Sequence, residues 1–210
     1  MTQKIKAMLI TAIRQTSSDR LTVVLEDESE IRSTLGVITD LRLYSGRDLE
    51  EDALEELRRR SARALGRERA LELISRRAMS RKELRDKLLQ KGETEDTAEY
   101  CAQWLEENGF LNDESYAAAV ARHYAAKGYG AGRVRSELSR RGIARELWDD
   151  AMEAMPEPDD KLEKFISSRL KDPQDRAQVQ KISNALYRRG YSWEEIRSAL
   201  RRHQAQIEEY

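Results

Sequence analysis

The sequence predicts a mainly all-α fold of three tandem three-helix repeats that form an elongated, curved stack, with a small β-hairpin-containing appendage at the N-terminus. A phrase of apolar, basic and glycine residues recurs three times, as Leu88-x-x-Lys91-Gly92, Leu138-x-x-Arg141-Gly142 and Leu186-x-x-Arg189-Gly190. Its glycines stand 50 and 48 residues apart, which indicates an internal repeat. Apolar residues follow a helical period from Leu49 onward but not before it. A repeated unit builds an extended surface rather than a single pocket.

The N-terminal appendage is predicted from a change in the apolar pattern. Ile5–Ile13 and Leu21–Leu25 are rich in branched apolar residues, and the polar stretch Thr16–Asp19 separates them, which is typical of a hairpin. A third strand is expected around Glu30–Arg32 and a short helix within Thr34–Leu43. Because an isolated hairpin is marginally stable in water, we expect it to pack on the helix that follows.

The first repeat is expected to follow a connecting helix. Leu54 and Leu65 mark that helix, and a separate helix is expected to start near Ala70. Ser80-x-x-Glu83 is a capping box that opens the middle helix. Gly92 is expected to end the middle helix in a left-handed conformation.

The second and third repeats follow the same plan. Asp113 is expected to cap the first helix of the second repeat, and Gly142 to end its middle helix. In the third repeat, Ser192-x-x-Glu195 is another capping box, and its helix is expected to continue through Ile207. The predicted organisation is an appendage over 1–48, a connecting helix over 49–63, and helical repeats over 64–112, 113–157 and 158–210.

Charge is abundant but balanced. Charged residues make up 37% of the chain and the net charge is −1, so bulk charge alone predicts no partner. Locally, residues 58–92 carry 13 Lys/Arg against 4 Asp/Glu, whereas residues 93–121 carry 8 acids and no base. Such blocks either form stripes that meet phosphates or acidic protein, or form a solvated surface with internal ion pairs.

The single cysteine and the lack of long apolar runs indicate a cytoplasmic protein. Cys101 shares one helical face with Ala98 and Leu105, which favours a buried structural thiol over a nucleophile. One cysteine cannot form an intrachain disulfide, which fits a reducing compartment. No apolar run approaches the roughly 20 residues of a membrane span. Ala7–Ile13 is too short, and lacks the cleavage site, for a signal peptide.

No residue pattern predicts catalysis. The glycine-rich loop Lys127–Arg133 precedes a helix and could receive a phosphate, but it lacks the Gly-Lys-Ser/Thr ending of a P-loop. We expect a connector there, with a phosphate-handling enzyme as the weakest alternative. His123 and His203 stand far apart, without metal-ligand spacing. We therefore expect a protein that is not an enzyme and that has no cofactor and no metal.

Two sets of side chains on the repeats could bind a partner. Tryptophans recur in the third helices at Trp104, Trp148 and Trp193, which favours packing over ligand stacking. Basic residues recur on the middle helices, where they form either a discontinuous binding track or ordinary surface charge over the apolar seams. This candidate basic set is Arg81, Lys82, Arg85, Lys87, Lys91, Arg133, Arg135, Arg140, Arg141, Lys181, Arg188 and Arg189.

The phrases of the first two repeats resemble a known family. One block runs from Ser80-x-x-Glu83-Leu84 to Lys91-Gly92, and Gly109-Phe110-Leu111-Asn112-Asp113 follows it. The next block is Gly130-x-x-Arg133-Val134-x-x-Glu137-Leu138-x-x-Arg141-Gly142-Ile143. Together they resemble the RecX family of recombination regulators. The resemblance covers about Ala64–His203, is weaker in the third repeat, and leaves residues 1–46 outside.

The resemblance implies a function that composition and spacing do not. It implies a non-enzymatic regulator, active in DNA recombination, DNA repair and the SOS response. Such a protein binds the RecA recombinase filament in its helical groove and reduces ATP hydrolysis and strand exchange. The expected partner is the RecA–DNA filament, with no membrane and with the protein as a monomer. The alternative is a helical-repeat protein that binds single- or double-stranded DNA directly through its basic middle helices.

Overall fold

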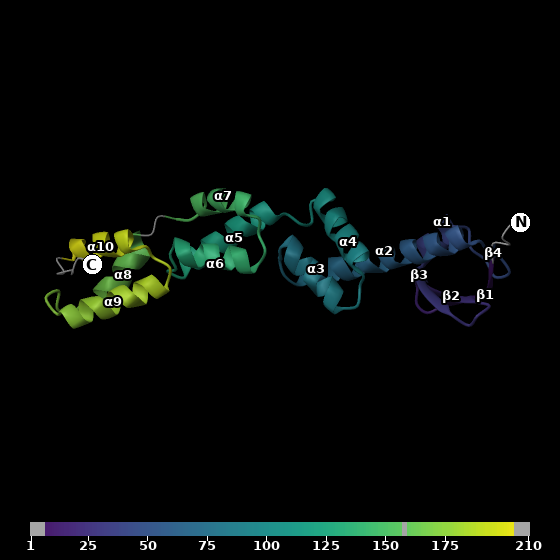
Figure 1. The fold of residues 1–210 in the computed structure, drawn as a ribbon, viewed down its shortest axis with the longest axis horizontal. Helices are drawn as coiled ribbons and strands as arrows, with labels where there is room; N and C mark the ends of the chain where they lie inside the picture. The colour runs from purple at the N-terminus through teal and green to yellow at the C-terminus, as the bar shows by residue number, and fades with distance from the viewer. Residues whose placement is uncertain (1–6, 157–158, 204–210) are drawn as a thin grey trace, which may run out of the picture. The chain divides into compact units, whose positions relative to one another are not determined.

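A computed structural model of the chain describes residues 7–156 and 159–203, whose helices and strands are labelled in Figure 1. These residues form two compact units. The first unit contains the residues up to 78 together with 84–110. The second contains 79–83 together with the residues from 111 onward. The first turn of the helix that begins at Arg81 therefore belongs to the second unit, whereas the rest of that helix belongs to the first.

The first unit combines a small antiparallel sheet with helices. Its strands and helices are β1 (Met8–Gln15), β2 (Arg20–Leu25), β3 (Glu30–Thr34), α1 (Leu35–Asp40), β4 (Asp48–Leu49), α2 (Glu51–Arg76), α3 (Arg81–Gln90, whose first turn is in the second unit) and α4 (Glu95–Glu107). The strand order is β3-β2-β1-β4. The predicted hairpin, third strand and short helix are confirmed for the described residues, and Ile5, the predicted start of the first strand, lies outside them. β4 pairs Leu49 with Met8 and is too short for a sequence pattern to reveal.

The sheet packs on α1 and α2, as the marginal stability of a hairpin predicted. Its core contains buried residues from all of these elements: Ile10, Val23, Leu25, Val37, Ile38, Leu49, Leu54, Leu57 and Ala64. A buried hydrogen bond also joins α2 to β3, since the Ser61 hydroxyl lies 2.8 Å from the Ser33 hydroxyl. The appendage is therefore anchored by the first half of α2.

The prediction of two helices before the capping box at Ser80 is wrong, because α2 runs without a break from Glu51 to Arg76. Gly66 lies inside it, where glycine ordinarily costs helix stability. A Cβ at Gly66 would come within 2.8 Å of Thr97 Cγ2 and 2.9 Å of Cys101 Sγ. The glycine therefore permits α4 to pack closely on a continuous helix and does not mark a helix end.

The apolar face of α4 is buried as predicted. Ala98, Cys101 and Leu105 are fully buried. Burial raises the pKa of the Cys101 thiol to about 11. The thiol is therefore protonated at neutral pH, and the expectation of a structural cysteine is confirmed.

The second unit is helical. Its elements are α5 (Asp113–Ala126), α6 (Ala131–Arg140), the 3-10 turn η1 (Arg145–Leu147), α7 (Trp148–Glu153), α8 (Asp159–Ser167), α9 (Arg176–Arg188) and α10 (Trp193–Arg202). One core joins α5, α6 and α7 through residues such as Val120, Leu138 and Ala151. Another joins α8, α9 and α10 through residues such as Ile166 and Leu186. The predicted position Ile207 in the last helix lies outside the described residues.

The three marker glycines end the middle helices as predicted. Gly92, Gly142 and Gly190 have φ values of 89°, 69° and 88°, in the left-handed region. At each of them the next residue donates its amide to the carbonyl five positions back, for example Ile143 to Leu138 at 3.0 Å. This is the Schellman arrangement. The threefold phrase is thus a helix-ending motif.

The predicted capping boxes are confirmed, but the role of Asp113 is not. The Ser80 and Ser192 boxes form with Glu83 and Glu195. Asn112, not Asp113, caps α5, because its backbone is extended and its side chain accepts the Ser115 amide at 2.8 Å. Asp113 is already the first helical residue of α5. Its Oδ1 instead accepts the Arg81 amide at 2.8 Å and caps α3.

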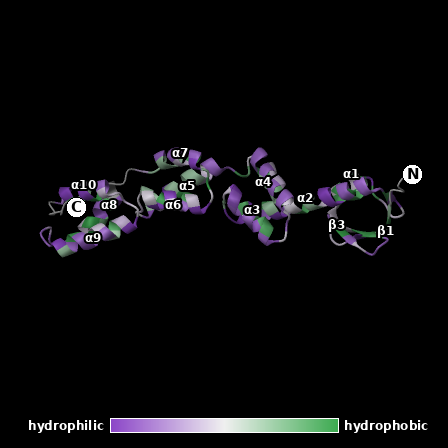
Figure 2. Ribbon diagram, in the orientation of Figure 1, coloured by the Kyte–Doolittle hydropathy of each residue, from purple (hydrophilic) through white to green (hydrophobic). Residues whose placement is uncertain are grey.

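Hydropathy follows this packing. Figure 2 shows hydrophilic residues along much of each helix, with hydrophobic residues on restricted faces. No helix in the described ranges is long and apolar enough to cross a membrane. Within the same ranges, no cluster of His, Cys, Asp and Glu could hold a metal ion.

Candidate partner-binding surface

Several of the candidate basic residues, such as Lys82, Arg133 and Arg141, lie beside two junctions in the second unit, whereas Arg85, Lys87 and Lys91 lie in the first unit. In each junction, the start of one middle helix packs on the glycine loop that ends another. At the α3–α6 junction the Ser80 hydroxyl donates to the Arg141 carbonyl at 2.5 Å. A Cβ at Gly142 would collide with the Lys82 side chain. Gly142 therefore serves both the left-handed turn and this close approach.

A polar cluster completes the α3–α6 junction. The Tyr116 hydroxyl donates to Glu83 Oε2 at 2.9 Å and accepts from Arg141 Nη1 at 2.5 Å. Arg141 Nη1 also lies 3.5 Å from Glu83 Oε1. Only 17% of the Arg141 side chain is exposed. Although Arg141 belongs to the candidate basic set, its guanidinium faces this junction.

The α6–α9 junction is made by backbone groups. The Gly130 amide donates to the Arg189 carbonyl at 3.0 Å, and the Gly132 amide donates to the Gly190 carbonyl at 2.9 Å. A Cβ at Gly130 would lie 2.5 Å from the Gly190 oxygen, and a Cβ at Gly190 would collide with the Arg133 backbone. The glycine-rich loop is therefore a connector, and these two amides are occupied by carbonyls.

Arg189 reinforces the α6–α9 junction. Its Nη1 donates to the Gly128 carbonyl at 3.3 Å. Its guanidinium lies 4.7 Å from the ring centroid of Phe165 and 5.5 Å from that of Tyr129. Arg189 occupies the same place in the repeated phrase as Arg141, but no carboxylate pairs with it among the described residues.

One buried carboxylate holds several of the candidate cations. Glu137 is only 4% exposed and lies 3.0 Å from Arg133 Nη2, 2.7 Å from Arg140 Nη2 and 3.9 Å from Arg141 Nε. Burial alone would raise the pKa of Glu137. Hydrogen bonds from Arg140 and Tyr124 and the charges of Arg140 and Arg133 outweigh burial and lower the pKa below its ordinary value of 4.5. Glu137 therefore stays ionised and neutralises part of the basic surface of α6.

The candidate basic set divides into paired and open cations. Arg85 pairs with Glu95 at 3.2 Å and Glu99 at 2.9 Å, and Arg81 and Lys82 are also engaged by neighbouring groups. Five members of the candidate basic set form no ion pair and no side-chain hydrogen bond with the described residues: Lys87, Lys91, Arg135, Lys181 and Arg188. We call these five residues the open cations. Each of the three middle helices or its C-cap supplies at least one of them.

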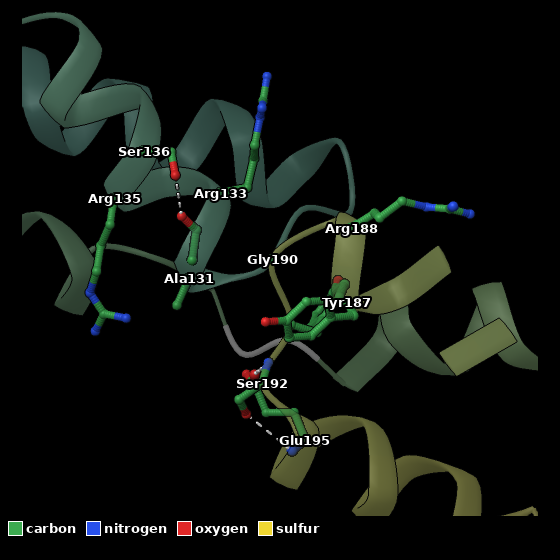
Figure 3. Close-up of a pocket in the computed structure, with 11 residues that line it drawn as sticks. Ala131, Arg133, Arg135, Ser136, Tyr187, Arg188, Gly190, Ser192 and Glu195 are labelled. Carbon is green, nitrogen blue, oxygen red and sulfur yellow. Dashed lines mark hydrogen bonds between the residues drawn. The ribbon is translucent and has the colours of Figure 1, made fainter. Parts of the chain in front are cut away.

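Two open cations border a solvent-open hollow of about 420 Å³ in the second unit. Figure 3 shows Ala131 and Arg135 projecting from α6, with Tyr187 of α9 and Ser192 before α10 across from them. Arg188 also lines the hollow. The Glu195 carboxylate lies there too, but it accepts the Ser192 amide at 2.6 Å in the capping box.

An exposed aromatic pair adjoins this hollow. Tyr187 stacks on Trp193 with ring centroids 5.2 Å apart and an interplanar angle of 19°. Tyr187 is 55% exposed and Trp193 is 47% exposed. Trp148, by contrast, is half-buried and donates to the Ile143 carbonyl at 3.1 Å. The packing role predicted for the recurring tryptophans is thus incomplete at Trp193. Tyr187 was missed because it stands at a variable position of the repeated phrase.

Three family models match the chain in series. The first three-helix domain of RecX matches residues 67–105, the second matches 112–152 and the third matches 157–200. The matches follow the order of the predicted repeats. They leave the N-terminal sheet outside.

Curated relatives and solved structures agree with these matches. The regulatory protein RecX of Xanthomonas axonopodis pv. citri (strain 306) is 38% identical over 138 residues, which are 64% of this chain and 85% of the relative. That of Vibrio vulnificus (strain CMCP6) is 31% identical over 135 residues, 62% of this chain and 88% of the relative. A crystal structure of regulatory protein RecX superposes with a TM-score of 0.68 at 22% identity, covering 91% of this chain and 99% of its own. RecX from Lactobacillus salivarius gives a TM-score of 0.61 at 22% identity, over 67% and 96% of the two chains. The two structures are similar to this chain in fold.

Proposed function

The chain belongs to the RecX family of regulatory proteins, and from this premise we propose that it binds the RecA–DNA filament along its helical groove and inhibits ATP hydrolysis and strand exchange. The observation that carries the proposal is the set of open cations on successive middle helices. A filament presents the same surface at regular intervals, and a stack of repeats presents one cation-bearing middle helix in each repeat, although the open cations stand at different positions of the repeated phrase. The proposed mechanism is occupancy of the groove, which obstructs the second DNA strand.

The open cations are proposed to make the contacts, whereas the paired cations hold the surface in shape. An arginine that already pairs with a buried carboxylate gains less from a new acidic partner than one that is surrounded by water. Arg135 and Arg188 are exposed and unpaired among the described residues, so they are available to acidic protein or phosphate. Arg141 is proposed to act only through the α3–α6 junction.

The test measures RecA's single-strand-dependent ATP hydrolysis and strand exchange with added protein. We expect inhibition at stoichiometric amounts, and weaker inhibition by the double variant Arg135→Glu/Arg188→Glu. Arg122→Glu is a matched control, because Arg122 is exposed on α5 in the same unit and has no ion pair among the described residues. Absence of inhibition by the unmodified chain would reject the proposal. Equal inhibition by the double variant and the control would reject the role of the open cations.

Direct binding to nucleic acid is the second candidate function, and the open cations beside exposed aromatic rings favour it. A phosphate-binding surface releases counterions, so the logarithm of affinity should fall with the logarithm of salt concentration by about 0.9 per phosphate neutralised on duplex DNA. A salt-insensitive interaction with DNA would exclude this function. The two candidates are compatible if the protein contacts both RecA and DNA within the filament.

We also propose that the protein is monomeric and cytoplasmic, that it catalyses no reaction and that it uses no cofactor. The occupied amides of Gly130 and Gly132 argue against phosphate binding at that loop. A nucleotide that bound there would raise the melting temperature. We expect no such shift with ATP or GTP, and we expect light scattering to report a mass near 24.3 kDa.

A further inference from the structure

We propose that Tyr187 and Trp193 form a stacking platform for one nucleobase of a single strand, whose phosphates contact Arg135 and Arg188. This site goes beyond filament binding and would act without RecA. It also makes the second candidate function specific, since it commits to a single strand and to contact with a base.

The aromatic pair lies largely outside the hydrophobic core. About half of each ring system is exposed, at 55% for Tyr187 and 47% for Trp193, whereas the neighbouring core residues Leu186 and Ile196 are almost fully buried. The two rings are nonetheless ordered against each other, 5.2 Å apart and nearly parallel. A preformed pair with exposed surface loses little conformational entropy when a third flat ring stacks on it.

Two arginines supply positive charge near the aromatic pair. Arg135 lines the hollow from α6, and Arg188 follows Tyr187 directly in the chain. Neither has an ion pair or side-chain hydrogen bond among the described residues. Figure 3 shows Arg135 on the far side of the hollow from Tyr187. The Arg188 side chain extends away from Tyr187 in the opposite direction. Two guanidinium groups on either side of an aromatic surface suit phosphates of one strand that passes over it.

Two acidic side chains near the aromatic pair limit where the phosphates of a bound strand can lie. Glu195 is turned to the Ser192 amide, at 2.6 Å, and so takes part in the capping box. Glu194 is exposed next to Trp193 and would repel a phosphate there. The backbone of the strand is therefore expected to run past Arg135 and Arg188 and to avoid Glu194. The bases of a duplex are stacked and paired within it, so only an unpaired base can reach the rings.

The experiment compares two labelled probes of equal length, oligothymidylate and an abasic oligomer with the same phosphates. Fluorescence anisotropy is measured at low salt without RecA. We expect the chain to bind oligothymidylate about tenfold more tightly, because base–aromatic stacking contributes roughly 1–3 kcal/mol per base. Tyr187→Ala should remove most of this preference, whereas Tyr187→Phe should retain it. Tyr44→Ala is the matched control, since Tyr44 is an equally exposed tyrosine, at 62%, with no ring partner among the described residues.

A second readout reports the stack itself. A base that stacks on Trp193 should quench part of the tryptophan fluorescence, and Trp193→Phe should lose that quenching. Equal affinity for the two probes, a preference that survives Tyr187→Ala, or no binding of either probe would overturn the proposal. If Tyr187→Ala weakened only the inhibition of RecA, the pair would contact protein and the nucleobase site would be rejected. Inhibition of RecA by the unmodified chain is measured separately, so failure of the site leaves the filament proposal standing.

Discussion

The two junctions of the second unit use equivalent helix ends but different chemistry. At the α3–α6 junction, side chains meet: Ser80 donates to a carbonyl, and Glu83, Tyr116 and Arg141 form a polar cluster. Such a junction depends on charge and on hydrogen-bonding groups that a substitution can remove one at a time.

At the α6–α9 junction, backbone meets backbone. The amides of Gly130 and Gly132 donate to carbonyls of the loop around Gly190, and the absence of Cβ atoms permits the approach. This junction uses the Arg189 cation without a carboxylate partner among the described residues, and it tolerates no added side chain at Gly130 or Gly190. One helix-ending motif can therefore support either kind of contact, and the residues that precede the facing helix determine which.

The largest expected effect tests close approach at Gly190. Gly190→Ala should lower the free energy of unfolding by about 3 kcal/mol or more, because a Cβ is strained at positive φ and would also collide with the Arg133 backbone. Gly92→Ala is the control, with φ of 89° against 88° and no atom within 4 Å of its Cβ position. It should cost only about 1 kcal/mol. Denaturant unfolding of both variants measures the difference, and equal losses would show that Gly190 serves only the turn.

The next effect compares the two arginines of the repeated phrase. Arg141→Met should lower the free energy of unfolding by about 2 kcal/mol, because it leaves Glu83 and Glu137 with one cation fewer in a largely buried cluster. Arg189→Met should cost about 1 kcal/mol, since it removes a carbonyl hydrogen bond and two ring contacts but leaves no carboxylate unpaired. Thermal unfolding ranks the two, and a larger loss at Arg189 would reverse the contrast.

Ionised Glu137 should stabilise the folded chain, and this stabilisation should be lost at acid pH. Its pKa in the folded chain lies below 4.5, so the stability it contributes is present above about pH 4.5 and is lost as pH falls through the folded pKa. Glu137→Gln should cost about 1–2 kcal/mol at neutral pH and should flatten the acid limb of the stability curve. Unfolding measured across the acid range checks this. An unchanged acid limb would mean that the loss of stability at acid pH comes from other carboxylates.

The smallest effect, of opposite sign, is expected at Asp113. Burial raises its pKa above 3.8 despite the Arg81 amide and charge, so ionisation in the folded chain costs stability as pH rises through the folded pKa. Asp113→Asn keeps an acceptor for the amide without the charge, and should change the free energy of unfolding at neutral pH by less than about 0.5 kcal/mol, towards higher stability. Asp113→Ala loses the cap and should cost about 1 kcal/mol. A marked loss in Asp113→Asn would show that the charge itself is required.

Local patterns predicted the parts of this fold that depend on local physics. The marker glycines, both capping boxes and the buried face of Cys101 follow from helix geometry within a few residues. The continuity of α2 did not, because Gly66 is explained only by α4 packing against it. Local patterns also did not predict the hydrogen-bond partner of Asp113, because Arg81 lies 32 residues away in the sequence.

The candidate surface was predicted less completely for the same reason. The sequence located the basic positions on the middle helices but could not separate Arg135 from Arg141. That distinction depends on the Glu83 carboxylate, which α3 supplies, and on Tyr116, which α5 supplies. The exposed stack of Tyr187 on Trp193 likewise arises from two helices; Trp193 recurs among the repeats, but no periodic signal marks Tyr187.

The most direct measurement is co-sedimentation of the chain with preformed RecA–DNA filaments, beside free RecA and bare DNA. We expect strong retention of the chain on filaments, reduced by Arg135→Glu/Arg188→Glu and unaffected by Arg122→Glu. Failure of the unmodified chain to sediment with filaments would contradict this expectation.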